Sequence, residues 1–179
     1  DVVGLDISES FCRIYGERFG HDRAICASVL ETGLADNSFD IVVAAGLHHL
    51  HPHVTQGVAE LARVLKPRGL FFYWEPVTGT FFNALRRVWY RFDRKYIKEN
   101  EAAIDVDELT KSVSSYLREV KRVYVGNVAH LFVLQTLALR IPVGLLRLYA
   151  PVCIAAEKLL NRLQLKWFSC NVVGLMVKR

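Results

Sequence analysis

The sequence lacks closely spaced cysteines, and it also lacks any long run of uncharged apolar residues. Its four cysteines lie far apart, at Cys12, Cys26, Cys153 and Cys170, with no C-x-x-C pair. Neither a zinc site nor a dense disulfide framework is therefore indicated, and we expect a reducing, cytoplasmic environment. Arginines and prolines interrupt the very apolar stretch 129–156, so no run reaches the roughly 18 uncharged residues that a membrane-spanning helix needs.

A secretory leader and a strongly one-sided charge are missing as well. The chain begins Asp-Val-Val-Gly-Leu-Asp, with no charged region ahead of an apolar one, so no signal peptide is expected in it. The 23 basic and 18 acidic residues give a net charge of +5, which falls short of the pattern of a nucleic-acid-binding protein. What the chain does have is apolar side chain, at 52% of residues, which is enough to build the core of one folded domain.

Short apolar runs alternate with helical patterns over the first 76 residues. Four of these runs predict strands: 2–5, 23–27, 39–45 and 70–74. One helix is expected after a cap at Ser8, and a second from residue 54. On the second helix Glu60 and Arg63 stand one turn apart, and we expect a surface ion pair of little energetic value. The alternation indicates βαβ units, and hence an α/β fold with a doubly wound, mostly parallel sheet.

The rest of the chain has a more helical pattern. An apolar stripe with Arg and Lys on the remaining surface predicts a basic amphipathic helix over 81–98. The spacing of Leu109, Val113, Leu117 and Val120 predicts another helix. Further along, the patterns predict a strand at 122–125, a helical region at 129–163 that is kinked or divided at its prolines, and a last strand at 167–177.

Three segments of the first half resemble one known family. They are Val-Val-Gly-Leu-Asp-Ile-Ser at 2–8, Ala-Asp-Asn-Ser-Phe-Asp-Ile-Val-Val-Ala-Ala at 35–45 with His48-His49 following, and Glu-Leu-Ala-Arg-Val-Leu-Lys-Pro-Arg-Gly at 60–69. In this order and spacing they resemble the second strand, the fourth strand and the approach to the fifth strand of class I S-adenosylmethionine-dependent methyltransferases. The resemblance implies a Rossmann-like sheet and an enzyme that uses S-adenosylmethionine, bound across the carboxyl ends of the strands.

The family's first strand and its glycine-rich loop have no counterpart in this sequence, because nothing precedes Asp1. We therefore expect a methyltransferase domain over 1–179 that lacks its first strand and is inactive by itself; a degenerate relative is the alternative. Residues 1–76 would form the cofactor-side core, 77–165 a largely helical acceptor or lid region added after the fifth strand, and 166–179 the closing strand.

The resemblance also implies cofactor contacts. Asp6, at the end of the second strand, would accept hydrogen bonds from the ribose hydroxyls, and Ile7 would cover one face of the adenine. Ser28, with Val29, stands where the family commonly has an aspartate for the adenine amino group, and a neutral hydroxyl accepts that bond less strongly. Ala45 would make a backbone contact with the cofactor. The alternatives are a solvated side chain at the strand end or a helix cap for Asp6, and ordinary packing for Ile7 and Ala45.

The histidines His48, His49, His51 and His53 form an H-H-x-H-x-H pattern. Imidazole is a common zinc ligand, so a histidine-cluster metalloprotein is an alternative. His48-His49 matches a family segment that binds no metal, however, and no metal is expected. His48 or His49 is instead a candidate general base beside the acceptor.

The later half bears on the acceptor and on partners. The basic helix 81–98 and the apolar stretch 129–156 favour a small, hydrophobic or amphiphilic and even lipid-like acceptor, and peripheral contact with a membrane through both segments. No nucleic-acid partner is expected. The alternatives are a packed helix with a solvated charged face and a methyltransferase-like binding protein without catalysis.

Overall fold

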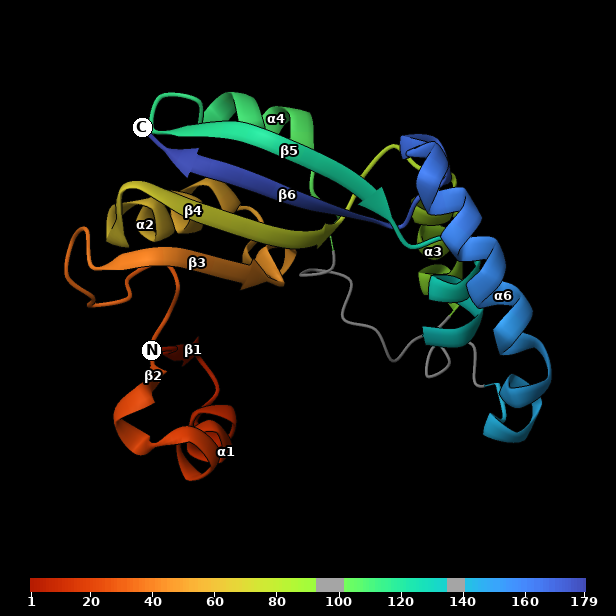
Figure 1. Ribbon diagram of the computed structural model, residues 1–179, viewed down its shortest axis with the longest axis horizontal. Coiled ribbons are helices and arrows are strands. Elements are labelled where there is room, and N and C mark those ends of the chain that lie inside the picture. Colours follow the sequence, from red (N-terminus) through yellow and green to blue (C-terminus); the bar gives the residue numbers. More distant parts are fainter. Residues whose placement is uncertain (93–101, 135–140) are drawn as a thin grey trace.

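The computed structural model describes residues 1–92, 102–134 and 141–179 (Figure 1). Two parallel strands, β1 (Gly4–Asp6) and β2 (Ala24–Cys26), form a small sheet. A larger sheet has the order β3 (Phe39–Ala45), β4 (Leu65–Pro76), β6 (Asn171–Lys178), β5 (Leu117–Val125). In it β3 and β4 are parallel, whereas β6 runs antiparallel to both β4 and β5. The predicted α/β class is thus confirmed.

Helices connect and cover these strands. They are α1 (Glu9–Phe19), α2 (Val54–Val64), α3 (Phe81–Phe92), α4 (Val106–Ser112) and α6 (Val143–Leu163), with a π-helical turn η3 (His130–Leu134) before α6. The main core packs α2 and α4 against the larger sheet, with Val58, Val106 and Phe71 fully buried. No helix in the described ranges is long and apolar enough to cross a membrane.

The sequence prediction fails at two places in the second half. The helix predicted from the spacing of Leu109 to Val120 ends at Ser112, and β5 begins at Leu117. A bulge in the pairing with β6, between Glu119 and Lys121, breaks the two-residue alternation of this strand and makes its apolar spacing look helical. The last strand begins at Asn171 rather than Trp167, because residues 166–168 form a short 3-10 turn, η4 (Lys166–Phe168).

Two predictions about helices can be compared with the structure. The basic helix predicted over 81–98 is α3 as far as Phe92, and its remaining residues lie outside the described ranges. The region 129–163 is divided as expected. Pro142 occupies the cap position before α6, while Pro151 lies inside that helix.

The facing edges of β1 and β3 are unpaired. β1 pairs only with β2, and β3 pairs only with β4, among the described strands. Figure 1 shows β1, β2 and α1 set apart from the larger sheet, below β3. On β3 the apolar side chains of Ile41 and Val43 are 53% and 75% exposed. The gap lies at the position where the family resemblance places the first strand.

A polar network ties the loop after β2 to α2. The Glu60 carboxylate accepts hydrogen bonds from the backbone N–H and the hydroxyl of Thr32, at 3.0 and 2.7 Å, and from the Arg63 guanidinium. Arg63 also donates to the Leu34 carbonyl and pairs with Asp36. Arg63, followed by the bonds from Thr32, holds the pKa of Glu60 down to about 2. The predicted ion pair of Glu60 and Arg63 is therefore confirmed, but its placement on the surface is wrong, because Glu60 is mostly buried and accepts several hydrogen bonds.

Candidate functional site

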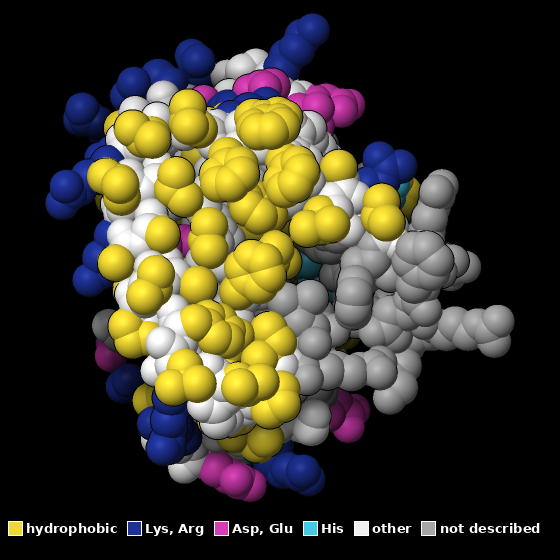
Figure 2. Space-filling view, turned by 90° about the vertical axis from the view of Figure 1, so that its right-hand side faces the viewer, with side chains coloured by type: hydrophobic (Ala, Val, Ile, Leu, Met, Phe, Trp, Pro, Cys, Tyr) yellow, Lys and Arg dark blue, Asp and Glu magenta, His cyan; other side chains and the backbone are white. Residues whose placement is uncertain are grey.

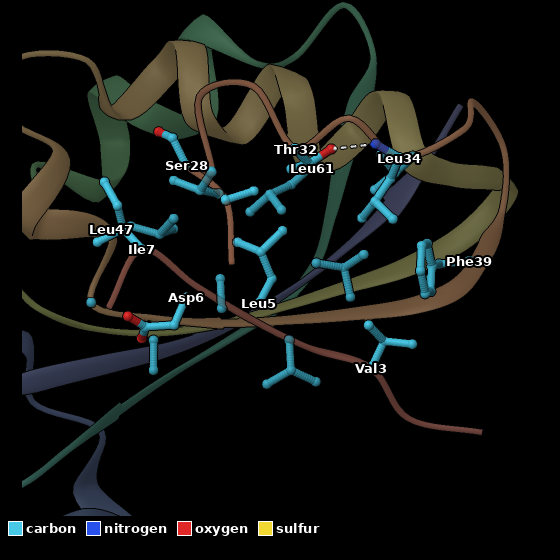
Figure 3. A pocket seen from close by; sticks show the side chains of 18 of the residues that line it. Val3, Leu5, Asp6, Ile7, Ser28, Thr32, Leu34, Phe39, Leu47 and Leu61 are labelled. Atoms are coloured by element: carbon cyan, nitrogen blue, oxygen red, sulfur yellow. Dashed lines mark hydrogen bonds between the residues drawn. The ribbon is translucent and has the colours of Figure 1, made fainter. Parts of the chain in front are cut away.

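A cavity of about 770 Å³ lies between β1 and β3 (Figure 3). Asp6, Ile7 and Ser28 lie toward one end of it, and Val3 and Phe39 lie toward the other. The polar end is thus the end at which β1 and β3 finish. A volume of this size lies in the range of small-molecule and cofactor sites.

All five residues predicted to contact the cofactor line this one cavity. Asp6 and Ile7 reach it from the end of β1, Ser28 and Val29 from the loop after β2, and Ala45 from the end of β3. Residues that are up to 39 positions apart in sequence are brought together because parallel strands end at the same edge of a sheet. Their roles toward a cofactor stay predictions.

The two carboxylate oxygens of Asp6 differ in their contacts. Its Oδ1 accepts a hydrogen bond from the Ser8 backbone N–H at 2.8 Å, so the side chain helps to start α1, and Ser8 in turn caps that helix. Its Oδ2 accepts no hydrogen bond from any described residue, and the side chain is exposed at the cavity wall. The helix-cap alternative is therefore observed, and it leaves one carboxylate oxygen for a ligand.

Ser28 and Ala45 set the shape of the polar end. The Ser28 hydroxyl oxygen accepts a hydrogen bond from the Leu30 backbone N–H at 3.2 Å, which leaves its own O–H as a donor and its second lone pair as an acceptor. Ala45 is followed by Gly46, which has φ +91° and ψ 18°. This left-handed conformation suits glycine, and it turns the chain from β3 into the short helical turn η2 (Leu47–Leu50).

The turn after Gly46 is built around Glu75, which the sequence analysis missed. Glu75 is the residue before the last in β4, and its carboxylate has no solvent exposure. Its Oε1 accepts from the Leu47 N–H at 2.7 Å and its Oε2 from the His48 N–H at 3.1 Å, while His48 Nδ1 lies 2.7 Å from Oε2. A buried carboxylate needs such partners to offset its desolvation. The only sequence signal was an acid directly after a predicted strand.

The two candidate general bases are placed differently. His48 is mostly buried and held by Glu75, whereas His49 lines the cavity. Their rings lie 3.9 Å apart between centroids. In the tautomer that carries its hydrogen on Nδ1, His48 donates to the Glu75 carboxylate and Nε2 is left as an acceptor. The role of either residue as a general base stays a prediction.

His51 and His53 do not join His48 and His49 in a metal site. Across the described ranges, no three His, Cys, Asp or Glu side chains are positioned to hold a metal ion. Cys12, Cys26 and Cys153 are free thiols.

Comparison with known proteins was made at the level of sequence families and of solved structures. A family described as "Methyltransferase domain" matches residues 1–73. No curated protein matches the chain. A SAM-dependent methyltransferase from Archaeoglobus fulgidus superposes with a TM-score of 0.62 at 14% identity, with 99% of this chain and 75% of that chain covered.

Two further solved structures, of proteins with different reactions, are similar in fold to this chain. The [4+2]-cyclase SpnF gives a TM-score of 0.60 at 16% identity, over 99% of this chain and 66% of that one. The N-methyltransferase NodS from Bradyrhizobium japonicum WM9, solved with S-adenosyl-L-homocysteine, gives 0.53 at 13% identity, over 97% and 64%. The chain thus spans about two thirds to three quarters of the length of these proteins, and the likeness is one of fold.

Together, the sheet, the cavity at the strand ends and these matches define a Rossmann-like class I methyltransferase fold. The first 73 residues match the methyltransferase domain family, and the described chain as a whole is similar in fold to solved S-adenosylmethionine-dependent methyltransferases.

Proposed function

We propose that the protein transfers a methyl group from S-adenosylmethionine to a small, hydrophobic or amphiphilic acceptor. The observation that carries this proposal is the meeting of Asp6, Ile7, Ser28, Val29 and Ala45 in one cavity, in a chain whose first 73 residues match the methyltransferase domain. When bound, the cofactor supplies the activated methyl group, and the protein supplies binding, alignment and exclusion of water.

The described residues fit the adenosine half of the cofactor. In this proposal Oδ2 of Asp6, which has no hydrogen bond from a described residue, accepts one from a ribose hydroxyl. The Ser28 hydroxyl accepts a hydrogen bond from the adenine amino group. Ile7 lies exposed beside them and packs against one face of the adenine. Among the described residues that line the cavity, Gly46 is the one glycine, so no glycine-rich loop for the methionine half is present in this part of the wall. In this proposal a further parallel strand and its glycine-rich loop fill the gap between β1 and β3 and complete the site.

His48 and Glu75 provide the proton chemistry in this proposal. Glu75 fixes the orientation and tautomer of His48 through the 2.7 Å contact at Nδ1. His48 Nε2 then accepts the proton that the acceptor loses as its oxygen, nitrogen or carbon atom is methylated. Glu75 acts as a positioning residue, and His49 forms the cavity wall next to this proton acceptor.

The acceptor class is argued from the added helices. Apolar side chains are exposed on α3 and along α6, among them Leu85, Leu148 and Val152. Such a surface favours a hydrophobic acceptor and a protein that works in contact with a membrane.

The [4+2]-cyclase on the same fold favours a second candidate, in which this protein binds a ligand or runs another reaction without methyl transfer. Two measurements on the full-length protein distinguish these candidate functions. One is calorimetric titration with S-adenosylmethionine, and the other is transfer of a labelled methyl group to lipid-like and polar acceptors. Binding followed by transfer to lipid-like acceptors supports the proposal. Binding without transfer to any acceptor would favour the second candidate, and turnover of polar acceptors alone would refute the acceptor class.

A further inference from the structure

Helix α6 is attached to the rest of the molecule through polar side chains. The Glu157 carboxylate accepts from the backbone N–H groups of Asn127 and Ala129, at 2.9 Å to each from Oε2. One turn further on, Asn161 Oδ1 accepts from Asn127 Nδ2 at 2.6 Å. Beyond the helix end, Gln164 accepts from the Tyr124 N–H at 2.9 Å. No residue of this 21-residue helix is buried.

The opposite side of α6 is apolar and faces solvent. Five large side chains spaced three, four or seven residues apart form one stripe along the helix: Leu145, Leu148, Val152, Leu159 and Leu163. Their exposed fractions run from 52% to 77%. Globular proteins usually turn such a stripe toward the core, so the amphipathic character of α6 is inverted.

Neighbouring elements extend this surface. Phe81 of α3 packs against Trp167 of η4 at 5.6 Å between ring centroids, and both stay exposed. Phe132 and Leu134 of η3 are exposed as well. Figure 2 shows hydrophobic side chains covering much of this face of the molecule, with Lys and Arg at its margin. We call α6 with these four neighbouring residues the apolar face.

The charges on α6 select the occupant of the apolar face. Arg147, Lys158 and Arg162 are exposed and fall on one edge of the stripe, and none has a hydrogen bond or ion pair with any described residue. The only acid in the helix, Glu157, is turned inward and occupied. Every outward charge of α6 is therefore positive. A second copy of the helix would bring cations together without partners, whereas anionic headgroups would supply them.

We propose that the apolar face docks the protein on an anionic lipid bilayer, with α6 lying in the plane of the surface. The leucine stripe enters the region between headgroups and acyl chains, Trp167 lies at the level where indole rings gather, and the three cations contact phosphates. This inference names the membrane contact of the proposed function, but it rests on the surface of α6 and not on the transfer reaction.

The test uses the full-length protein and sedimentation with phosphatidylcholine vesicles, with and without phosphatidylserine. We expect binding to the anionic vesicles that salt weakens. Leu148→Asp with Val152→Asp should reduce it more than about tenfold. Lys158→Gln with Arg162→Gln should reduce it by about fivefold per cation, and only on anionic vesicles.

Matched controls lie far from the apolar face. Val120→Asp alters a half-exposed apolar residue of β5, and Lys111→Gln with Arg118→Gln removes two cations near that strand. These variants should bind vesicles like the parent. Circular dichroism and calorimetric titration with S-adenosylmethionine check that each variant keeps its fold and its cofactor site, so failed docking and failed cofactor binding are distinguishable. Absence of vesicle binding, unchanged binding by Leu148→Asp with Val152→Asp, or a stable dimer that this variant dissociates would overturn the proposal.

Discussion

His48 Nδ1 lies 2.7 Å from Oε2 of Glu75, a carboxylate with no solvent exposure. The contact joins the turn after β3 to the end of β4, and the adjacent backbone N–H groups of Leu47 and His48 complete the carboxylate's partners. His48 precedes His49, which lines the cavity, so the buried acid and the imidazole it contacts are a pair that can be tested at the candidate site.

Glu75→Gln should slow methyl transfer by the full-length protein at least tenfold, since positioned general bases contribute about 10²–10⁴ in rate. The variant keeps the shape of the side chain but removes the charge that fixes the His48 tautomer. If Glu75 acts through His48, the variant His48→Ala with Glu75→Gln should be no slower than His48→Ala alone. Additive losses in turnover would show that the two residues act separately. Asp40→Asn, whose carboxylate pairs with Lys66 at the start of β3, is the control with unchanged turnover.

The contact between His48 and Glu75 also shows what the sequence could predict. The strands expected at 2–5, 39–45 and 70–74 are confirmed as β1, β3 and β4, because each is a short apolar run bounded by turn residues. The five residues that the family resemblance implied for cofactor contact all line the cavity, because the strands that carry them end at the same edge. The role of Glu75 was not predictable, because it depends on the register that sets Ala45 beside Trp74.

Local patterns failed where long-range pairing decides the structure. Leu117 and Val120 have helical spacing, but pairing with β6 makes them strand residues with a bulge between Glu119 and Lys121. The spacing of Glu60 and Arg63 indicates only a surface pair, because their partner Thr32 comes from a distant loop. The apolar stripe on α6 faces solvent, and this too could not be predicted from the sequence. Helical periodicity identifies the apolar side of a helix but does not show whether that side faces the core or the solvent.

Acid should weaken the fold through Glu60. Its pKa is lowered from 4.5 to about 2, so its contribution to stability is present above pH 4.5 and is lost as the pH falls toward 2. Glu60→Gln removes this titration. Urea unfolding at neutral pH should therefore show the variant less stable than the parent by about 1–3 kcal/mol, and the difference should shrink between pH 4.5 and 3. A difference that stays constant with pH would contradict the assigned pKa.

Gly174→Ala should destabilise the larger sheet. Gly174 in β6 pairs with Tyr73 in β4, and a Cβ on Gly174 would come within 2.2 Å of Tyr73 Cε1. Relief would require movement in a closely packed core, at a cost of about 1–3 kcal/mol. Thermal unfolding should show the loss, and an unchanged midpoint would mean that the Tyr73 ring can move aside. Tyr73→Phe is the companion variant and should not destabilise, because the buried hydroxyl has no hydrogen-bond partner among the described residues.

The sharpest test of the cofactor site is a pair of substitutions at Asp6 in the full-length protein. Asp6→Ala removes a charged acceptor from the ribose, and hydrogen bonds to charged groups contribute about 1.5–3 kcal/mol each, so affinity for S-adenosylmethionine should fall at least about tenfold. It also removes the bond from the Ser8 N–H, so some loss of stability is expected. Asp6→Asn keeps an oxygen acceptor for that N–H, and should bind the cofactor better than Asp6→Ala while staying as stable as the parent.

The comparison of the two variants separates the roles of Asp6. Calorimetric titration measures the affinity for S-adenosylmethionine. Thermal unfolding measures the stability that the hydrogen bond from the Ser8 N–H contributes. Asp40→Asn, at the opposite end of β3 from Ala45, should leave cofactor affinity unchanged. If Asp6→Ala loses stability but binds S-adenosylmethionine like the parent, Asp6 serves only to start α1, because the ribose then finds its acceptor elsewhere.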